Sequence, residues 1–416
     1  MLKNVILIVL ATVLLPQLIT YSSQFFSIFV KPQLPYLYAR YGGEDVSGGC
    51  QIVRAVGLQH CEDVATIRQV QDEHTGYSPM LAGCDDRFAY NTVLGVFDDI
   101  VTPGTLQLVA PYKDLDGRVD VTVMPITIDD DADFDLHPLG IGVSPVNSAR
   151  VFVVNHALEE SRVEVLDVDY DLARAHRVAS IAHPLISTPN SIAAIDDTSF
   201  YVSNDHRFGL RGRTVAGKVV NMLETFLRLP LGEVNLVRFA EGDGTVDVQR
   251  AAKHIAYANG VVAFDDKLAV GSTTTNQVLL YRRDIQTDAL EYLRSIHLPF
   301  HVDNLSYDKE GGVVLASGHP HYPTLARYVR SKGKTEDPMS WVVAIEVDKE
   351  QEEMEETRGE GEVAQRRLLK GNKKDSIHSV IQSDGQFASS VTTLERNGDA
   401  LVGGGLYMNG LLTCRI

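Results

Sequence analysis

The chain has 416 residues, of which 44% are hydrophobic and 22% are charged, and its formal net charge is −17 with a pI near 5.2. This composition is globular and supports a substantial buried core, arranged as one large β domain rather than two. The acidic balance argues against a nucleic-acid partner, because no basic stripe is available to neutralise phosphates.

The beginning of the chain is apolar. Residues 5–15 form an apolar run after Lys3, which fits a signal-peptide core or a short signal anchor better than a full membrane span. No small-residue cleavage site follows, and residues 25–30 prolong the apolar character, so cleavage and retention as an anchor both stay open. We expect residues 1–30 to direct the chain into the secretory pathway, as a secreted or membrane-anchored protein, and residues 31–416 to form a single domain.

Short apolar alternations separated by Gly, Asp and Asn turns recur along the rest of the chain. They cover residues 107–110, 119–123, 150–154, 162–166, 260–264, 267–270, 277–281, 312–316 and 341–346. Many short strands at regular spacing are typical of an all-β sandwich, barrel or propeller. The length after the leader divides into six units of about 60 residues, enough for four short strands each, so a six-bladed propeller fits. No strict repeat signature such as a Trp-Asp dipeptide supports this number of blades.

Two segments interrupt the β pattern. Residues 213–228 carry apolar side chains at helical spacing together with basic positions, which predicts a helix that covers a cleft, touches a membrane surface or packs on a sheet edge. Residues 348–374 are rich in Glu, Arg and Lys and poor in apolar residues, which predicts a solvated loop or a disordered insertion. We expect no chemistry from this second segment.

The four cysteines of a secreted chain invite pairing, with three connectivities open. Cys50 and Cys414 are the suggestive pair, because a bond between them would tie together the two ends of the folded region in an oxidising compartment. The chain-entropy account gives such a long loop a stabilisation on the order of 5 kcal/mol. Cys61 and Cys84 either pair with each other or stay as two small buried residues.

Two short strands joined by a tight acidic turn are expected at residues 189–195 and 200–206, with Asp196 and Asp197 in the turn. Asparagine is a poor strand former. Asn190 and Asn204, which flank these apolar strands, therefore need either a turn explanation or a metal-ligand explanation.

Oxygen-bearing residues at other strand ends extend the ligand explanation. They are Glu62, Asn259, Asp303 and Asn304. Two carboxylates with three amides supply hard oxygen ligands in about the number that calcium takes, whereas zinc calls for His and Cys and magnesium keeps more water. Each short motif alone is more often a turn than a ligand, and no EF-hand loop supports the calcium assignment.

A longer set of short segments follows one order along the chain. These are Cys50, Cys61-Glu62-Asp63, Gly140-Ile141, Val153-Val154-Asn155-His156, Asn190-Ser191-Ile192, Asn204-Asp205-His206-Arg207-Phe208, Ala258-Asn259-Gly260, Val302-Asp303-Asn304-Leu305-Ser306, Gly318-His319-Pro320 and Leu412-Thr413-Cys414. Over most of its length the chain thus resembles the serum paraoxonase/arylesterase family. The resemblance implies an all-β, six-bladed propeller closed by the Cys50–Cys414 disulfide, with accessory helices at the N-terminus and over the tunnel mouth.

The resemblance also implies two metal positions. Glu62, Asn190, Asn259, Asp303 and Asn304 would hold a catalytic calcium at the floor of the central tunnel. A second, structural calcium would involve Asp63, the carbonyl of Ile141 and the position of Ser191. The family has Asp where this chain has Ser191, and the loss of a carboxylate predicts a weaker or absent second ion.

A histidine pair is implied as well, with one departure from the family. His156 matches the family histidine proposed to help activate water. The family has a second His directly before the Gly140-Ile141 pair, but this chain has Leu139 there and His137 two residues earlier. His137 either replaces the missing residue after a small loop shift or is a surface histidine beside Pro138.

The expected activity is a calcium-dependent hydrolysis of carboxylic esters, lactones and aryl esters. Calcium would polarise the carbonyl or phosphoryl oxygen for attack by water, with His156 or a carboxylate such as Asp303 as the base. No Gly-x-Ser-x-Gly elbow is present, which disfavours a serine nucleophile. Besides the small-molecule substrate, the N-terminal segment and the 213–228 helix are expected to contact a membrane or lipid surface.

Two alternatives stay open. The chain is also compatible with a non-catalytic propeller that binds a partner and holds a structural calcium. A sugar-lactone hydrolase of the related gluconolactonase type is the other, although the Cys50 and Cys414 pair favours the paraoxonase branch. Asn304-Leu305-Ser306 is also a formal glycosylation sequon, and a glycan there would be incompatible with a ligand role.

Overall fold

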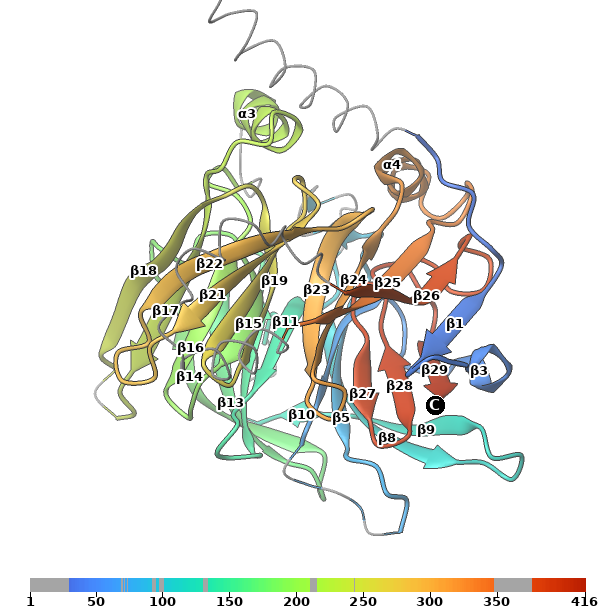
Figure 1. Ribbon diagram of the computed structural model, residues 1–416. Coiled ribbons are helices and arrows are strands. Elements are labelled where there is room, and N and C mark those ends of the chain that lie inside the picture. The colour runs from blue at the N-terminus through green and yellow to red at the C-terminus, as the bar shows by residue number, and fades with distance from the viewer. Residues whose placement is uncertain are drawn as a thin grey trace, which may run out of the picture.

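A computed structural model describes residues 30–68, 70, 72, 74–91, 95–96, 101–129, 134–209, 215–242, 244–347 and 376–416. The expected signal segment before Val30, with any accessory helix in it, and the charged segment 348–374 lie outside these residues. The described chain forms six sheets arranged around a central axis, which confirms the expected six-bladed β-propeller (Figure 1).

Each blade runs from an inner strand beside the axis to an outer edge strand. Blade 1 consists of β4 (Cys61–Thr66), β5 (Met80–Cys84), β8 (Thr105–Lys113) and β9 (Val119–Pro125). Blade 2 consists of β11 (Pro138–Val143), β12 (Arg150–Asn155), β13 (Arg162–Asp169) and β14 (Arg174–Ile181), with β10 (Thr127–Ile128) parallel to β14 at its edge. Blade 3 consists of β15 (Pro189–Ala194), β16 (Ser199–Asn204), β17 (Gly232–Phe239) and β18 (Val246–Ile255).

The other three blades are built in the same way. Blade 4 consists of β19 (Ala258–Phe264), β20 (Lys267–Ser272), β21 (Gln277–Arg283) and β22 (Leu290–His297). Blade 5 consists of β23 (His301–Asp308), β24 (Val313–His319), β25 (Ser340–Glu346) and β26 (Ile377–Ser383), extended by β1 (Tyr38–Tyr41) and β2 (Glu44–Asp45). Blade 6 consists of β27 (Glu395–Asn397), β28 (Ala400–Gly403), β29 (Leu411–Arg415) and β3 (Cys50–Val53). A small hairpin of β6 (Tyr90–Asn91) and β7 (Gly95–Val96) and a 3-10 turn, η2 (Ser47–Gly49), complete the strand regions.

All nine predicted apolar runs overlap strands of these blades, as do the two strands expected around the acidic turn. The antiparallel strands β15 and β16 are joined through Asp196 and Asp197 as predicted. Apolar runs predict these strands correctly because a strand packed between neighbouring sheets buries apolar side chains along its length.

The ring is closed by strands from opposite ends of the sequence. β3 pairs with β29, and Cys50 lies opposite Cys414 in this register. The Cys50–Cys414 disulfide is present, as expected, and Cys61 is bonded to Cys84 across β4 and β5, so both cysteine pairs are settled. The first described strands therefore complete the last blades, which prevents the ring from opening at that seam.

Apolar side chains fill the wedges between neighbouring blades. Between blades 2 and 3, the fully buried rings of Phe152 and Phe200 lie 4.9 Å apart, within a cluster that also includes Leu139. The other wedges are packed in the same manner, for example by Phe264 and Ile345 between blades 4 and 5. Face-to-face packing of this kind makes each blade depend on its neighbours.

Two described α-helices, α3 (Val215–Phe226) and α4 (Tyr322–Arg330), lie at the same end of the ring (Figure 1). α3 confirms the helix predicted within residues 213–228. The ring of Tyr322 contacts both Phe226 of α3 and His301 at the start of β23, each at 6.1 Å between centroids. The helices thus cover the end at which the inner strands begin. Within the described ranges, neither helix has the length and apolarity that a membrane crossing requires.

Candidate metal centre and active site

The inner strands of five blades leave their ladders at the same place. The residues that are skipped in the pairing with the second strand are Glu62, Leu139-Gly140, Asn190-Ser191, Asn259-Gly260 and Asp303-Asn304. Such bulges redirect side chains and are common next to functional sites. Because each inner strand contacts the inner strand of the next blade, the bulges form one ring around the axis.

Two glycines allow this ring to be narrow. A Cβ atom on Gly140 would lie 2.6 Å from the carbonyl oxygen of Asn190, and one on Gly260 would lie 2.5 Å from the Cα of Asn304. Only glycine permits backbones to approach so closely. At these two glycines the backbones of neighbouring bulges lie close together, at the level of the predicted ligands.

Hydrogen bonds connect the predicted calcium ligands across blades. Asn304 Nδ2 donates to Glu62 Oε1 at 2.8 Å, and Asn259 Nδ2 donates to Asp303 Oδ1 at 2.9 Å. We call the side chains of Glu62, Asn190, Asn259, Asp303 and Asn304 the upper cluster. All five are buried, and no hydrogen bond joins the Asn190 amide to the other four side chains.

In the upper cluster the amide nitrogens of Asn259 and Asn304 donate hydrogen bonds, but four acceptor oxygens have no partner. The buried oxygens without a hydrogen-bond partner are Glu62 Oε2, Asn190 Oδ1, Asn259 Oδ1 and Asn304 Oδ1. Leaving buried acceptors unsatisfied is costly, and a native structure with several at one place calls for an explanation. Amide and carboxylate oxygens are the ligands that calcium prefers, so these residues fit the ion that the sequence predicts.

The charges of the site favour a cation as well. Burial, followed by the negative charges of Asp303 and Asp63, raises the pKa of Glu62 well above its usual range. A cation between the carboxylates would reverse this repulsion. Among the described residues no three His, Cys, Asp or Glu side chains gather as a metal-binding group, so the amide oxygens are needed to complete the ligand set.

The residues of the predicted second calcium form a different arrangement, which we call the lower cluster: Asp63, Ile141 and Ser191. Asp63 Oδ2 accepts a hydrogen bond from the Ile141 N–H at 2.8 Å, and Ser191 Oγ accepts one from the Val261 N–H at 3.2 Å. Burial raises the pKa of Asp63 to about 7, against the opposing effect of the Ile141 N–H. One carboxylate whose oxygen is already engaged is a poor match for a second calcium.

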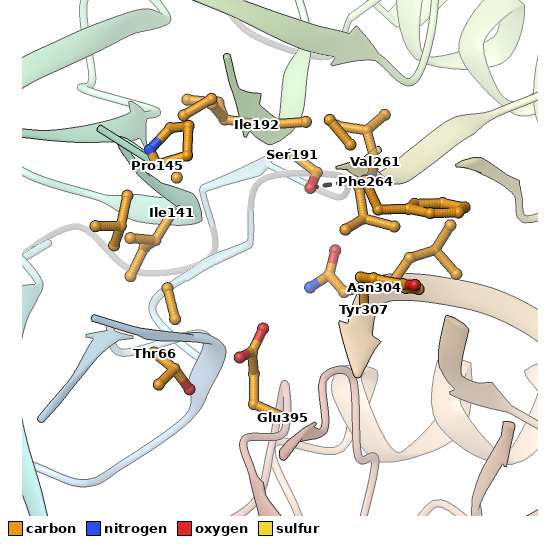
Figure 2. Close-up of a pocket in the computed structure, with 18 of the residues that line it drawn as sticks. Thr66, Ile141, Pro145, Ser191, Ile192, Val261, Phe264, Asn304, Tyr307 and Glu395 are labelled. Atoms are coloured by element: carbon orange, nitrogen blue, oxygen red, sulfur yellow. Dashed lines mark hydrogen bonds between the residues drawn. The ribbon is translucent and has the colours of Figure 1, made fainter. Parts of the chain in front are cut away.

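A cavity of about 540 Å³ lies next to the lower cluster, and Figure 2 shows the Asn304 amide and the Glu395 carboxylate pointing into it. Its walls include Ile192, Phe264 and Tyr307, and it extends along the later residues of the inner strands, away from α3 and α4. Near its mouth Arg68 Nη2 lies 2.9 Å from Glu395 Oε2. The central tunnel therefore contains a cavity large enough for solvent on the side opposite the helices.

His156 lies beside the upper cluster. It is buried, its Nε2 is 2.7 Å from the carbonyl oxygen of Pro189, and its Nδ1 is 3.2 Å from Ser161 Oγ. Pro189 directly precedes Asn190, so the ring is anchored one residue from a predicted ligand. Its role as a base stays a prediction.

His137 is fully buried, so its interpretation as a surface histidine is wrong. Its Nδ1 lies 2.9 Å from Asp85 Oδ2 and its Nε2 lies 3.1 Å from Asp135 Oδ1. The Asp85 carboxylate is hydrogen-bonded to the ring, the Asp135 carboxylate lies close to it, and the His137 carbonyl oxygen accepts the His156 N–H at 2.9 Å. Leu139 packs in the apolar wedge between blades 2 and 3 and brings no polar group to the centre.

Three buried groups near the upper cluster had no predicted role. His319 Nε2 lies 2.8 Å from Asp303 Oδ2, which orients that carboxylate. Burial lowers the pKa of His301 to about 4, so this ring is neutral at physiological pH. The fully buried Arg87 donates through Nη2 to the Pro138 carbonyl oxygen, and its charge opposes the rise in the pKa of Glu62. In the sequence, His319 belongs to the Gly318-His319-Pro320 segment and His301 directly precedes Val302, and no signal pointed to Arg87.

Asn190 and Asn204, the two asparagines that flank apolar strands, have different explanations. Asn204 Oδ1 accepts the Thr188 N–H at 3.1 Å and its Nδ2 donates to the Leu185 carbonyl oxygen at 2.7 Å, so Asn204 is a structural residue. Asn190 keeps a free buried oxygen and fits the ligand explanation. Asn304 of the sequon is buried on β23, which leaves no room for a glycan in the folded chain.

Comparison with known proteins finds a family model, curated relatives and solved structures that are similar to this chain. The arylesterase family model matches residues 53–358. Serum paraoxonase/lactonase 3 of Oryctolagus cuniculus is 29% identical over 197 residues, and serum paraoxonase/arylesterase 2 of Bos taurus is 27% identical over 199 residues. Each alignment covers 47% of this chain and 52% of the relative, so the chain spans about half the length of these curated relatives. Among solved structures, a luciferin-regenerating enzyme is similar at 14% identity, over 85% of this chain and 95% of that one, with a TM-score of 0.41.

Proposed function

Because the chain belongs to the arylesterase family, we propose that it is a calcium-dependent hydrolase of carboxylic esters, lactones and aryl esters. The single observation that carries the calcium assignment is the set of buried, unpartnered oxygens of Glu62, Asn190, Asn259 and Asn304 at the centre of the ring. The names of the curated relatives, which are paraoxonases, lactonases and arylesterases, support the substrate class.

The chain's own residues prepare this site. Asn259 and Asn304 turn their amide nitrogens to Asp303 and Glu62, which leaves their Oδ1 atoms available to a cation. His319 holds the other Asp303 oxygen, so the carboxylate is fixed before substrate arrives. Calcium bound there would polarise the carbonyl or phosphoryl oxygen and stabilise the developing oxyanion during attack by water. Rigid ligands of this kind limit reorganisation during the reaction.

The base that accepts the proton from water is His156 or Asp303. With Nε2–H donated to Pro189, His156 Nδ1 accepts the Ser161 hydroxyl, and both Asp303 oxygens likewise accept hydrogen bonds. His156→Gln and Asp303→Asn separate the two possibilities by the pH dependence of kcat/KM at saturating calcium. The residue whose substitution removes the ionisation from the profile is the base.

Calcium dependence is tested by following phenyl acetate and lactone hydrolysis with and without a chelator. We expect chelation to abolish turnover and added calcium to restore it. Asn304→Ala should abolish turnover with little change in expression, whereas a purely structural role would appear as lost yield. Activity that survives complete removal of calcium contradicts the proposal.

We further propose that α3 contacts a lipid surface, together with the N-terminal segment of a chain that enters the secretory pathway. The apolar side chains exposed on and just after α3 are Val219, Val220, Met222, Leu223 and Leu227. An apolar patch of this size on a helix is typical of an interaction surface, and two disulfides fit an oxidising compartment. Met222→Asp with Leu223→Asp should abolish co-sedimentation with vesicles while leaving turnover of soluble phenyl acetate unchanged.

One observation favours a second candidate, a non-catalytic binding module. Leu139 is packed in the core, so the position directly before Gly140 brings no polar group to the centre, and the His137 ring lies beside Asp85 and Asp135. If purified protein binds calcium yet hydrolyses no ester or lactone of any chain length, this candidate replaces the hydrolase.

A further inference from the structure

The Cys61–Cys84 disulfide lies directly beside a predicted calcium ligand. The two cysteines face each other across β4 and β5, and both are buried. Cys61 is the last paired residue before the bulge that releases Glu62 from the ladder. The covalent bond thus fixes the backbone at the point where the strand turns Glu62 toward the axis.

Glu62 needs such fixation more than the other charged ligand does. Its carboxylate is buried near Asp303 and Asp63, and only one of its oxygens has a hydrogen-bond partner, Asn304. Asp303, in contrast, is held through both oxygens, by Asn259 and His319. The position of Glu62 therefore depends on the backbone of β4 more than the position of Asp303 depends on the backbone of β23.

Other contacts hold the same stretch of backbone. Thr392 Oγ1 donates to the carbonyl oxygen of Glu62 at 2.5 Å, and a Cβ atom on Gly404 would lie 2.2 Å from the carbonyl oxygen of Cys61. His60, just before the disulfide, has a left-handed φ of 52° and donates its N–H to the Met408 carbonyl oxygen. Blade 6 therefore supports β4 from one side while the disulfide joins it to β5 on the other.

The corresponding residues in other blades are not cross-linked. Ala258 precedes Asn259, and Val302 precedes Asp303, at the position that Cys61 holds before Glu62. An amide ligand carries no net charge, and Asp303 has its two hydrogen bonds. Among these inner strands, a disulfide is present only beside Glu62, the charged ligand with a single hydrogen-bonded oxygen.

We infer that the Cys61–Cys84 disulfide is a positioning device for Glu62 and thereby sets the calcium affinity of the upper cluster. This inference rests on the proposed function, since it takes calcium as the ion. Because coupling between two equilibria is reciprocal, bound calcium should in turn protect this disulfide from reduction.

The test compares two double variants by calcium titration calorimetry on purified full-length chains. We expect Cys61→Ala/Cys84→Ala to raise the calcium Kd at least tenfold. The matched control, Cys50→Ala/Cys414→Ala, removes the other strand-to-strand disulfide far from the site and should keep the Kd within twofold in its folded fraction. Melting temperatures in chelator report the stability of each variant separately from its calcium affinity.

A second variant guards against loss of folding. Thr392→Val keeps both disulfides, removes a hydrogen bond to the Glu62 backbone and should raise the Kd threefold or more. Equal calcium affinity in wild type, Thr392→Val and Cys61→Ala/Cys84→Ala overturns the positioning role alone. A wild-type chain that binds no calcium overturns the calcium assignment, and the inference with it.

Discussion

The upper and lower clusters lie at, or directly after, the same bulges but differ in how their oxygens are used. In the upper cluster, amide nitrogens bond to carboxylates and four buried oxygens are left free. In the lower cluster, backbone N–H groups of the neighbouring inner strands occupy Asp63 and Ser191. Whether a ring of polar residues can bind a cation therefore depends on how many acceptor oxygens remain unpaired, and not on how many polar residues it contains.

The largest expected difference between the clusters is in catalysis. Asp303→Asn should lower kcat/KM for phenyl acetate by about 10³-fold or more, because it removes a charge at the proposed metal. Asp63→Asn should lower it less than tenfold, since the amide oxygen can still accept the Ile141 N–H. Steady-state kinetics at saturating calcium measure both, and similar losses in the two variants would erase the distinction.

The second expected difference is in stoichiometry. We expect the wild-type chain to bind one calcium ion and Ser191→Asp to bind two, because the new carboxylate joins Asp63 at the lower cluster. Ser191→Asn, of similar size and without charge, is the matched control and should bind one. Calorimetric stoichiometry decides the matter, and two ions in the wild type would show that the lower cluster is a site after all.

The third expected difference is in pH dependence. Burial raises the pKa of Asp63 to about 7 from an ordinary 3.8 and also raises that of Glu62, so the folded, calcium-free chain holds protons that the unfolded chain releases. These groups therefore lower the free energy of unfolding as pH rises from about 4 to about 7, by on the order of 4 kcal/mol for Asp63 alone.

Thermal melts in chelator between pH 5 and 8 measure this effect. The melting temperature should fall with pH, and Asp63→Asn should flatten the slope. In the presence of calcium the fall should shrink, because the ion stabilises the deprotonated upper cluster. A melting temperature independent of pH in chelator would show that the buried carboxyls are already ionised.

The smallest expected effect is on stability. Ser191→Ala removes the acceptor of the buried Val261 N–H and should destabilise the chain by about 1–2 kcal/mol, with calcium affinity unchanged. Ser203→Ala is the matched control, because Ser203 Oγ accepts the Ser191 N–H in the same blade. Urea denaturation measures both variants. A large loss of calcium affinity in Ser191→Ala would mean that the lower cluster supports the ion directly.

Much of the fold was predictable from the sequence, because apolar alternation and the terminal cysteines reflect local and covalent constraints. The upper-cluster residues were singled out as oxygen-bearing residues at strand ends, and the resemblance, not their spacing, joined them into one site. Their inner strands share a five-residue pattern in which the third residue varies widely while the fifth is always aliphatic, as in Val64, Ile141, Ile192, Val261 and Leu305. A repeat that conserves only one apolar position is hard to see in one sequence.

What could not be predicted depends on contacts between distant segments. The burial of His137 follows from Asp85, 52 residues earlier, and the partner of Ser191 Oγ lies 70 residues later in another blade. The Cys61–Cys84 pairing required the register of β4 and β5. No local pattern encodes such partners, which the closed ring brings together.

The pairing of β3 with β29 has a consequence for biosynthesis. Blade 6 takes its outer strand from residues 50–53 and its other strands from residues 395–415, so it is incomplete until nearly the whole chain has been translated. Up to that moment a growing arc of blades presents bare strand edges, which are prone to pairing with other chains. The nascent protein should therefore depend on chaperones until the final strand arrives and the Cys50–Cys414 bond forms.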